Sequence, residues 1–422
     1  MATSTSIKRT YYVLSFGNIL AASMIWGINT IFLLDAGLSN FEAFAANAFF
    51  TLGMVAFEVP TGIVADIWGR RISFLLGTLT LSAGTGLYVF LWYLSAPFWQ
   101  WAIVSVILGL GFTFFSGAVE AWLVDALGAI GYTGQLESVF ARVQIISGMG
   151  MLMGSVGGGL LAQVTNLGVP FIVRSAILVI MFFIAVFTMR DIGFVPDRSA
   201  HPLKQMRRIV SDSVTYGWRI RAVKYLMIAA IFTGGVSIYV FYALQPYLLD
   251  LYGDDQAYGI AGLVAAIIGG SQTVGGLLAP AIRSAFRRRT SVMLIANSVG
   301  AFSVVLIGIL ANLWVAIVMI VIWGLLAAAS FPIRQAYLND MIPSQQRATI
   351  LSMDSLMSSS GGIVTQPVLG RAADVWGYPV SYVLAGLISA LSVPFIARSR
   401  MQNSSADIGL NTSSAEKSDR EV

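Results

Sequence analysis

One short stretch decides how this chain folds: Glu58-Val-Pro-Thr-Gly-Ile-Val-Ala-Asp-Ile-Trp-Gly-Arg-Arg71. A long apolar run leads into it, and a second apolar run leaves it at Ile72. Its glycines and charged residues therefore mark a tight connection between two apolar helices. The 422 residues of the whole chain are 57% hydrophobic and only 11% charged, whereas soluble domains carry about 25% charged residues. We infer a protein that crosses a membrane many times.

Twelve apolar runs are long enough to cross a bilayer, since each helical span needs about 20 apolar residues. They lie at about 11–34, 41–64, 72–94, 100–125, 139–164, 171–190, 223–249, 258–282, 291–311, 313–338, 348–370 and 379–398. An even number of spans places both termini on the same side of the membrane. Clusters of lysine and arginine identify that side as the cytoplasm. These clusters lie at Lys8/Arg9, Arg70/Arg71, 190–224, 283–289 and Arg398/Arg400.

The charge and the cysteine content exclude several kinds of partner. The net charge is +5, but the basic residues follow the predicted topology, so we expect no nucleic-acid partner. The chain has no cysteine, which excludes disulfides and thiolate metal sites. Its single histidine, His201, stands in a polar stretch, which argues against a histidine-based metal site. We expect no metal and no cofactor, and the lipid bilayer as the surroundings of the protein.

The sequence divides into two similar parts. The polar residues 191–222 separate an N-terminal bundle of six helices, 11–190, from a C-terminal bundle, 223–400. Ala118–Asp125 parallels Ile333–Asp340 at an offset of about 215 residues, which aligns Asp125 with Asp340. We expect residues 1–10 and 401–422 to be cytoplasmic, with 401–422 disordered. The central loop, 191–222, is expected to be cytoplasmic and to contain an amphipathic helix on the inner leaflet.

The opening stretch resembles a known signature. Gly62, Asp66, Gly69, Arg70 and Arg71 match G-x-x-x-D-x-x-G-R-[RK], which transporters of the major facilitator superfamily carry between helices 2 and 3. The resemblance implies twelve transmembrane helices in two six-helix bundles related by a pseudo-twofold repeat. It also implies a monomer, a cavity surrounded by helices 1, 4, 7 and 10, and both termini in the cytoplasm. The chain resembles bacterial drug/proton antiporter-like members of this family.

The signature predicts part of a gate on the cytoplasmic side. Asp66 stands where it can bind the exposed N–H groups at the start of the eleventh span, because a carboxylate is stabilised at a helix N-terminus. Arg70 and Arg71 are expected to reach Asp125 or Glu120. In the C-terminal half Pro280 replaces the equivalent aspartate, so that mirror cluster is incomplete. Further candidates for gate salt bridges are Arg142, Arg334, Asp340 and Arg347.

Acidic residues inside spans are candidates for proton coupling, because each buried charge costs at least about 2.5–3.5 kcal/mol. These residues are Glu58, Glu120 and Asp354. Glu58 is the strongest candidate, because it shares one helix face with Asn47, Thr51 and Met54. A desolvated glutamate can take up a proton near neutral pH. The alternative is that these charges form a salt-bridge network that holds the inner gate shut.

The residues of the predicted cavity suggest a partly apolar organic solute. They are Trp26, Asn29, Tyr239, Tyr242, Gln245 and Gln335. We expect a small-molecule substrate, protons as the coupling ion and a multi-pass protein of the bacterial inner (plasma) membrane. Proton-coupled export is favoured, with proton-coupled uptake of a nutrient or metabolite as the alternative. A non-transporting membrane sensor is the alternative of another class, and the absence of H-E-x-x-H and P-loop motifs argues against an enzyme.

Overall fold

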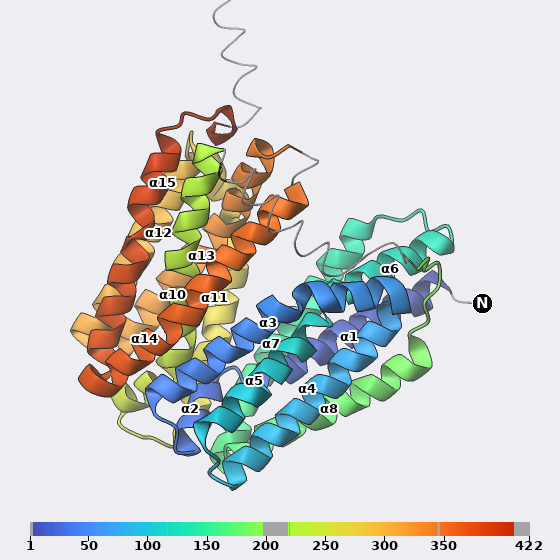
Figure 1. Cartoon of the computed structure of the whole chain (residues 1–422), viewed down its shortest axis with the longest axis horizontal. Coiled ribbons are helices and arrows are strands. Elements are labelled where there is room, and N and C mark those ends of the chain that lie inside the picture. Colours follow the sequence, from blue (N-terminus) through green and yellow to red (C-terminus); the bar gives the residue numbers. More distant parts are fainter. Residues whose placement is uncertain (1–2, 116, 197–217, 219, 344–346, 409–422) are drawn as a thin grey trace, which may run out of the picture. The chain divides into compact units, whose positions relative to one another are not determined.

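The computed structural model describes the chain except residues 1–2, 116, 197–217, 219, 344–346 and 409–422 (Figure 1). Its regular elements are all helical in this part of the chain. They are α1 (Ser4–Ser23), α2 (Asn29–Asp35), α3 (Asn40–Trp68), α4 (Arg70–Tyr93), α5 (Phe98–Thr113), α6 (Ala118–Ala129), α7 (Leu136–Val164), α8 (Gly168–Thr188), α10 (Arg221–Tyr252), α11 (Tyr258–Ala285), α12 (Arg289–Leu310), α13 (Leu313–Met341), α14 (Arg347–Ala390), α15 (Ser392–Arg400) and a 3₁₀ turn, η2 (Ser405–Asp407).

Ten helices of the described residues are long and apolar enough to cross a membrane. Many of their large apolar side chains remain exposed, including Leu79, Phe90 and Phe302, as expected where lipid rather than protein covers a helix. The last apolar stretch, Ile350–Arg400, has 51 residues and is long enough for two crossings. It is divided at Gly377, which has a non-helical φ of 79°. The predicted all-α membrane fold is confirmed.

Two other predicted spans are interrupted. The run 100–125 divides between α5 and α6, where Gly117 has a left-handed φ of 68°. The run 11–34 divides into α1 and α2, which are separated by turns at Met24–Ile28. Hydropathy does not reveal the second break, because the intervening residues, Met-Ile-Trp-Gly-Ile, carry no polar side chain and are at least as apolar as the helices they separate. The break is important for the site described below.

The chain forms two compact units, which are described separately. Unit 1 comprises Met1–Leu203 with Tyr242–Ala266, and unit 2 comprises Lys204–Phe241 with Ile267–Val422. The second part of α10 and the first part of α11 thus belong to the same unit as α1–α8. The predicted amphipathic helix in the central loop falls largely on residues 197–217 and 219, which lie outside the described residues.

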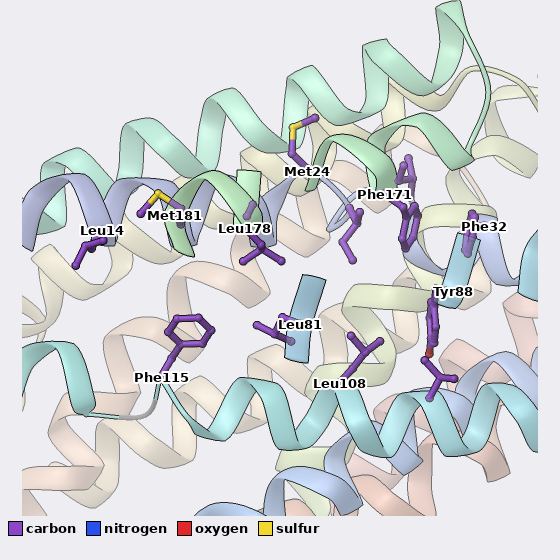
Figure 2. Close-up of a cluster of buried hydrophobic side chains, with 14 of the residues drawn as sticks. Leu14, Met24, Phe32, Leu81, Tyr88, Leu108, Phe115, Phe171, Leu178 and Met181 are labelled. Atoms are coloured by element: carbon purple, nitrogen blue, oxygen red, sulfur yellow. The ribbon is translucent and has the colours of Figure 1, made fainter. Parts of the chain in front are cut away.

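The core of unit 1 lies where α1 and α2 meet α4, α5 and α8 (Figure 2). Phe32 stacks on Phe171 with ring centroids 3.9 Å apart, and the ring of Tyr88 meets Trp101 edge-on at 4.9 Å. Trp101 is fully buried and its indole N–H donates to the carbonyl of Ala96 at 3.1 Å. Aromatic packing of this kind fixes the short helix α2 in place, although seven residues alone make a marginal helix.

Candidate functional site

The connection between α3 and α4 brings three of the predicted gate residues together. Gly69 ends α3 and precedes α4, with φ 105° and ψ 155°, a conformation open essentially only to glycine. It turns the chain so that Arg70 Nη1 lies 2.6 Å from Asp66 Oδ1. Arg70 Nε lies 4.0 Å from Asp125 Oδ2 on α6. Gly62, in contrast, lies inside α3, and a Cβ at that position would meet no other atom within 4 Å.

A further acid, which the sequence analysis did not single out, holds this connection. Asp191, just after α8, accepts a hydrogen bond through Oδ1 from the backbone N–H of Arg71 at 3.0 Å. It therefore caps α4, which has no side-chain cap of its own. Its other carboxylate oxygen would collide with a Cβ on Gly69. Burial raises the pKa of Asp191, and the N–H and positive charge of Arg71 partly oppose that shift.

The side chain of Arg71 has a different partner from the predicted one. Its Nη2 donates to the carbonyl of Val186 at the end of α8, at 2.6 Å. The indole N–H of Trp122 donates to the carbonyl of Arg190 at 2.7 Å. The segment that leaves α8 is thus bound to both α4 and α6. Two sequence features indicate that Asp191 caps α4. An aspartate follows the sixth span, and the third span begins without a Ser, Thr, Asp or Asn that could cap it.

Unit 2 contains the counterpart of this cluster. Arg289 Nη1, at the start of α12, lies 2.6 Å from Asp340 Oδ2 on α13. Since Asp340 aligns with Asp125, this pair repeats the approach of Arg70 to Asp125. Arg347 donates from Nη2 to the carbonyl of Asn339 at 3.3 Å. Pro280 lies inside α11, so the equivalent of Asp66 is absent, as the sequence indicates.

The start of the C-terminal tail completes the cluster in unit 2. Asp407 is 1% exposed and accepts from the N–H and the hydroxyl of Thr290, each at 2.8 Å. It caps α12 as Asp191 caps α4, so in each half an aspartate after the sixth span caps the third. Arg283 Nη2 donates to the carbonyl of Ile408 at 2.7 Å. Contrary to the expected disorder from Met401 onward, residues 401–408 are folded onto unit 2; residues 409–422 lie outside the described residues.

Arg334 and Asp354, predicted for separate roles, form a two-pronged ion pair between α13 and α14. Arg334 Nη1 lies 2.7 Å from Asp354 Oδ2, and Nη2 lies 2.5 Å from Oδ1. Arg334 Nη2 also donates to the carbonyl of Leu226 at 3.2 Å. The Arg334 side chain is 20% exposed and the Asp354 side chain 7%. Asp354 is thus more buried than Asp66, Asp125 and Asp340, the acids of the gate pairs, whose side chains are 38–45% exposed.

The pair borders a cavity of about 530 Å³ that lies wholly within unit 2. Hydroxyl and amide groups line much of it, and Trp323 and Phe331 add aromatic surface. The polar lining residues other than the pair include Thr233, Ser237, Asn297, Ser330, Gln335, Ser355 and Ser358. Of the predicted cavity residues, Gln335 lies here. The cavity can therefore hold water or a small organic molecule beside a buried charge pair.

Several predicted residues lie apart from these clusters. Glu58 on α3, Glu120 in the first turn of α6 and Arg142 on α7 are all exposed. Tyr239 is fully buried, and its hydroxyl is hydrogen-bonded to Ser381, which is a packing arrangement. The proposed contact between Asp66 and the start of the eleventh span would join the two units, and it stays a prediction.

The break in the first span is held by a predicted cavity residue, Gln245 on α10. Its Oε1 accepts from the N–H of Thr30 at 2.8 Å, and its Nε2 donates to the carbonyl of Trp26 at 2.5 Å. Asn29 Nδ2 donates to Asn47 Oδ1 on α3 at 3.1 Å. Backbone groups at a helix break need such partners, because the bilayer core supplies no water. Tyr242, one turn before Gln245, is half-buried on the same helix.

Glycines permit the close packing around the break. A Cβ on Gly27 would come within 2.6 Å of the Cα of Gly262 on α11. A Cβ on Gly158 of α7 would overlap the carbonyl oxygen of Met24, whereas one on Gly157 would meet nothing within 4 Å. Small residues allow helix backbones in membranes to approach closely. The backbone of the break is therefore enclosed by α7, α10 and α11.

Comparison with known families agrees with this fold. The sequence model of the Major Facilitator Superfamily matches residues 11–287 and 260–412. The chain belongs to this family. An uncharacterized MFS-type transporter, YxaM of Bacillus subtilis (strain 168), is 22% identical over 385 residues, covering 89% of this chain and 90% of that one. Multidrug resistance protein MdtG of Escherichia coli O6:K15:H31 (strain 536 / UPEC) is 27% identical over 213 residues, covering 49% and 48%.

Solved structures of transporters have the same fold as this protein. The crystal structure of the nucleoside transporter NupG matches with a TM-score of 0.77 at 12% identity, over 93% of this chain and 98% of that one. A peptide transporter POT matches with a TM-score of 0.74 at 12% identity, over 95% and 96%. At this identity the likeness shows the fold alone. The superfamily member is thus a multi-pass membrane transporter whose substrate has to be inferred from its own residues.

Proposed function

We propose that this protein is a proton-coupled secondary transporter that exports a small, partly apolar organic compound by alternating access. The observation that carries the proposal is the buried Arg334–Asp354 pair beside a cavity in unit 2 that has both apolar and polar lining residues. The partial similarity to a multidrug resistance protein supports export. The inner membrane of a bacterium is the proposed location, and a monomer the proposed functional form.

The geometry of the pair suits proton coupling. Breaking a buried ion pair by removing one charge costs about 3–5 kcal/mol, because the other charge is left without compensation. A proton on Asp354 removes one charge in this way and changes the partners available to Arg334. One proton moving through 100 mV supplies about 2.3 kcal/mol, which is similar in size. Proton binding at Asp354 can therefore bias which conformation of the transporter is populated.

This proposal gives Asp354 the role that the sequence alone favours for Glu58. Asp354 is 5% exposed and is bound to Arg334. Glu58 is exposed on α3. Glu58 remains the competing candidate and is tested in the same experiment. Asp66, Arg70 and Asp125 are proposed to belong to the cytoplasmic gate.

A second function, proton-coupled uptake of an anionic solute, is favoured by one observation. Both guanidinium N–H groups of Arg334 that bind Asp354 become available when the carboxylate is protonated. A carboxylate on the solute has the geometry to replace Asp354 there. Proton and solute would then bind together, which is the thermodynamic requirement for symport.

The test is transport in proteoliposomes with an imposed pH gradient. Solutes are screened by the proton flux that they elicit, using a small set of neutral, cationic and anionic aromatic compounds. Asp354→Asn should abolish gradient-driven accumulation of the active compound while retaining its exchange across the membrane without a gradient. Glu58→Gln should retain gradient-driven transport. If Asp354→Asn accumulates solute like the wild type and Glu58→Gln does not, Asp354 is the wrong residue.

A further inference from the structure

The broken first span contains polar groups that a continuous helix would not present. The carbonyl of Trp26 and the N–H of Thr30 both point to one partner, the carboxamide of Gln245. Gln245 is 3% exposed and reaches the break from another helix, 215 residues further along the chain. We propose that the break is a binding site for a carboxamide group of the transported compound, and that Gln245 occupies this site as an internal surrogate. The proposal rests on the transport function and specifies the chemical class of its substrate.

The two hydrogen bonds define which chemical group fits. Trp26 offers an acceptor and Thr30 a donor, so the ligand must present an N–H and a carbonyl oxygen side by side. A carboxylate has no hydrogen for the Trp26 carbonyl, and an ammonium has no acceptor for the Thr30 N–H. The groups that make these contacts are all uncharged. A neutral amide or lactam edge therefore satisfies both positions, as the Gln245 side chain does.

Two further polar atoms beside the break lack a hydrogen-bond partner among the described residues. They are Thr30 Oγ1 and Asn47 Nδ2. Thr30 is fully buried, and Asn47 accepts from Asn29 through its other side-chain atom. Native structures seldom leave buried polar atoms unpaired, and such atoms indicate a missing water or ligand. A ligand with polar groups beyond its amide can pair with atoms that Gln245 leaves unused.

Gln245 is suited to be displaced. It makes its two contacts only with the tip of a flexible side chain, whereas the backbone of the break is held by close glycine packing. A ligand amide that replaces it keeps both hydrogen bonds at the break, so the exchange costs no backbone pairing. Trp26 is half-buried beside the site and offers aromatic surface to the rest of the ligand.

The experiment measures equilibrium binding of radiolabelled benzamide to the purified full-length protein in nanodiscs, without a pH gradient. Gln245→Ala removes the internal competitor and should bind benzamide at least tenfold more tightly than the wild type. Gln245→Asn keeps an amide on a side chain that is one methylene shorter, and it should also bind benzamide more tightly than the wild type. This variant tests the proposal if Gln245→Ala fails to fold. Acetophenone, which has a methyl group in place of the amide nitrogen, should compete at least tenfold less well.

Gln366→Ala is the matched control. Gln366 is a fully buried glutamine in unit 2, and its amide nitrogen donates to Gly362 on its own helix at 3.1 Å. This variant should bind benzamide like the wild type. Equal gains for benzamide and acetophenone in Gln245→Ala would show only a new apolar hole and would overturn the proposal, as would no gain for benzamide.

The two proposals fail in different ways. Binding without a gradient does not depend on Asp354, so a negative result here leaves the proton-coupling assignment in place. Conversely, gradient-driven transport that survives Asp354→Asn rejects the coupling assignment and leaves amide binding at the break untouched.

Discussion

Removal of the Asp354 charge should strongly destabilise unit 2, and the size of the effect follows from burial. Asp354→Asn keeps the shape of the side chain but leaves Arg334 as a largely buried cation. Loss of one partner of a buried pair costs about 3–5 kcal/mol. The Arg334 side chain is 20% exposed and borders a cavity, so it keeps some hydration. We expect the lower end of that range, about 3 kcal/mol.

The matched comparison is Asp66→Asn, which breaks the ion pair of Arg70 at the other cluster. The Asp66 side chain is 45% exposed, and exposed pairs contribute only about 0–1 kcal/mol. The double variant Arg334→Gln/Asp354→Asn removes both charges and should lie within about 1 kcal/mol of the wild type. The free energies are measured by denaturant unfolding of the reconstituted protein, followed by tryptophan fluorescence.

One result would refute this reasoning. If Asp354→Asn and Asp66→Asn cost the same, below about 1 kcal/mol, the Arg334–Asp354 pair behaves as an exposed one. Protonation of Asp354 would then change the free energy of its conformation by less than about 1 kcal/mol. That is too little to drive a conformational change, because one proton moving through 100 mV supplies about 2.3 kcal/mol.

Three further predictions concern the capped helices. Gly69→Ala should cost about 1–3 kcal/mol of stability and lower transport, because alanine disfavours the backbone conformation of Gly69. Gly62→Ala should be neutral or slightly stabilising, because Gly62 lies inside a helix and faces open space. The free energies of unfolding of the two variants distinguish these outcomes. Asp407→Ala should cost about 0.5–2 kcal/mol through loss of the α12 cap, while Ser405→Ala, at an exposed position of the same turn, should cost nothing measurable in the same assay. Burial raises the pKa of Asp191 in the folded protein, so its contribution to the free energy of unfolding should fall as pH rises from the unfolded pKa through the folded one. Asp191→Asn should flatten that part of the pH profile, and an unchanged profile would count against this cause.

Much of the architecture is already determined by the sequence. Hydropathy locates the spans because the bilayer core accepts only helices whose backbone groups are satisfied internally. The stretch from Glu58 to Arg71 identifies the connection between α3 and α4, and the repeat aligns Asp125 with Asp340. Both aspartates then lie near the predicted kind of partner, Arg70 and Arg289. Short-range patterns suffice for these features because each depends on neighbouring residues or on a repeat.

The remaining features depend on contacts between residues far apart in the chain. Asp191 caps α4 through Arg71, which lies 120 residues earlier, and Asp407 caps α12 through Thr290, which lies 117 residues earlier. Arg334 and Asp354 lie on different helices, and the periodicity of each helix shows only which face avoids lipid. Periodicity does not show which helix lies opposite that face, so their pairing required the tertiary structure.

The break in the first span shows the same division most clearly. Residues 11–34 are predominantly apolar and read as one helix, because hydropathy measures the side chains and not the backbone hydrogen bonds. The backbone can open at Met24–Ile28 only where other groups pair with it, and those groups come from Gln245, 215 residues away. Sequence therefore predicts that this segment crosses the membrane. Tertiary packing alone decides that it folds as two helices, with Gln245 pairing the backbone groups at the break.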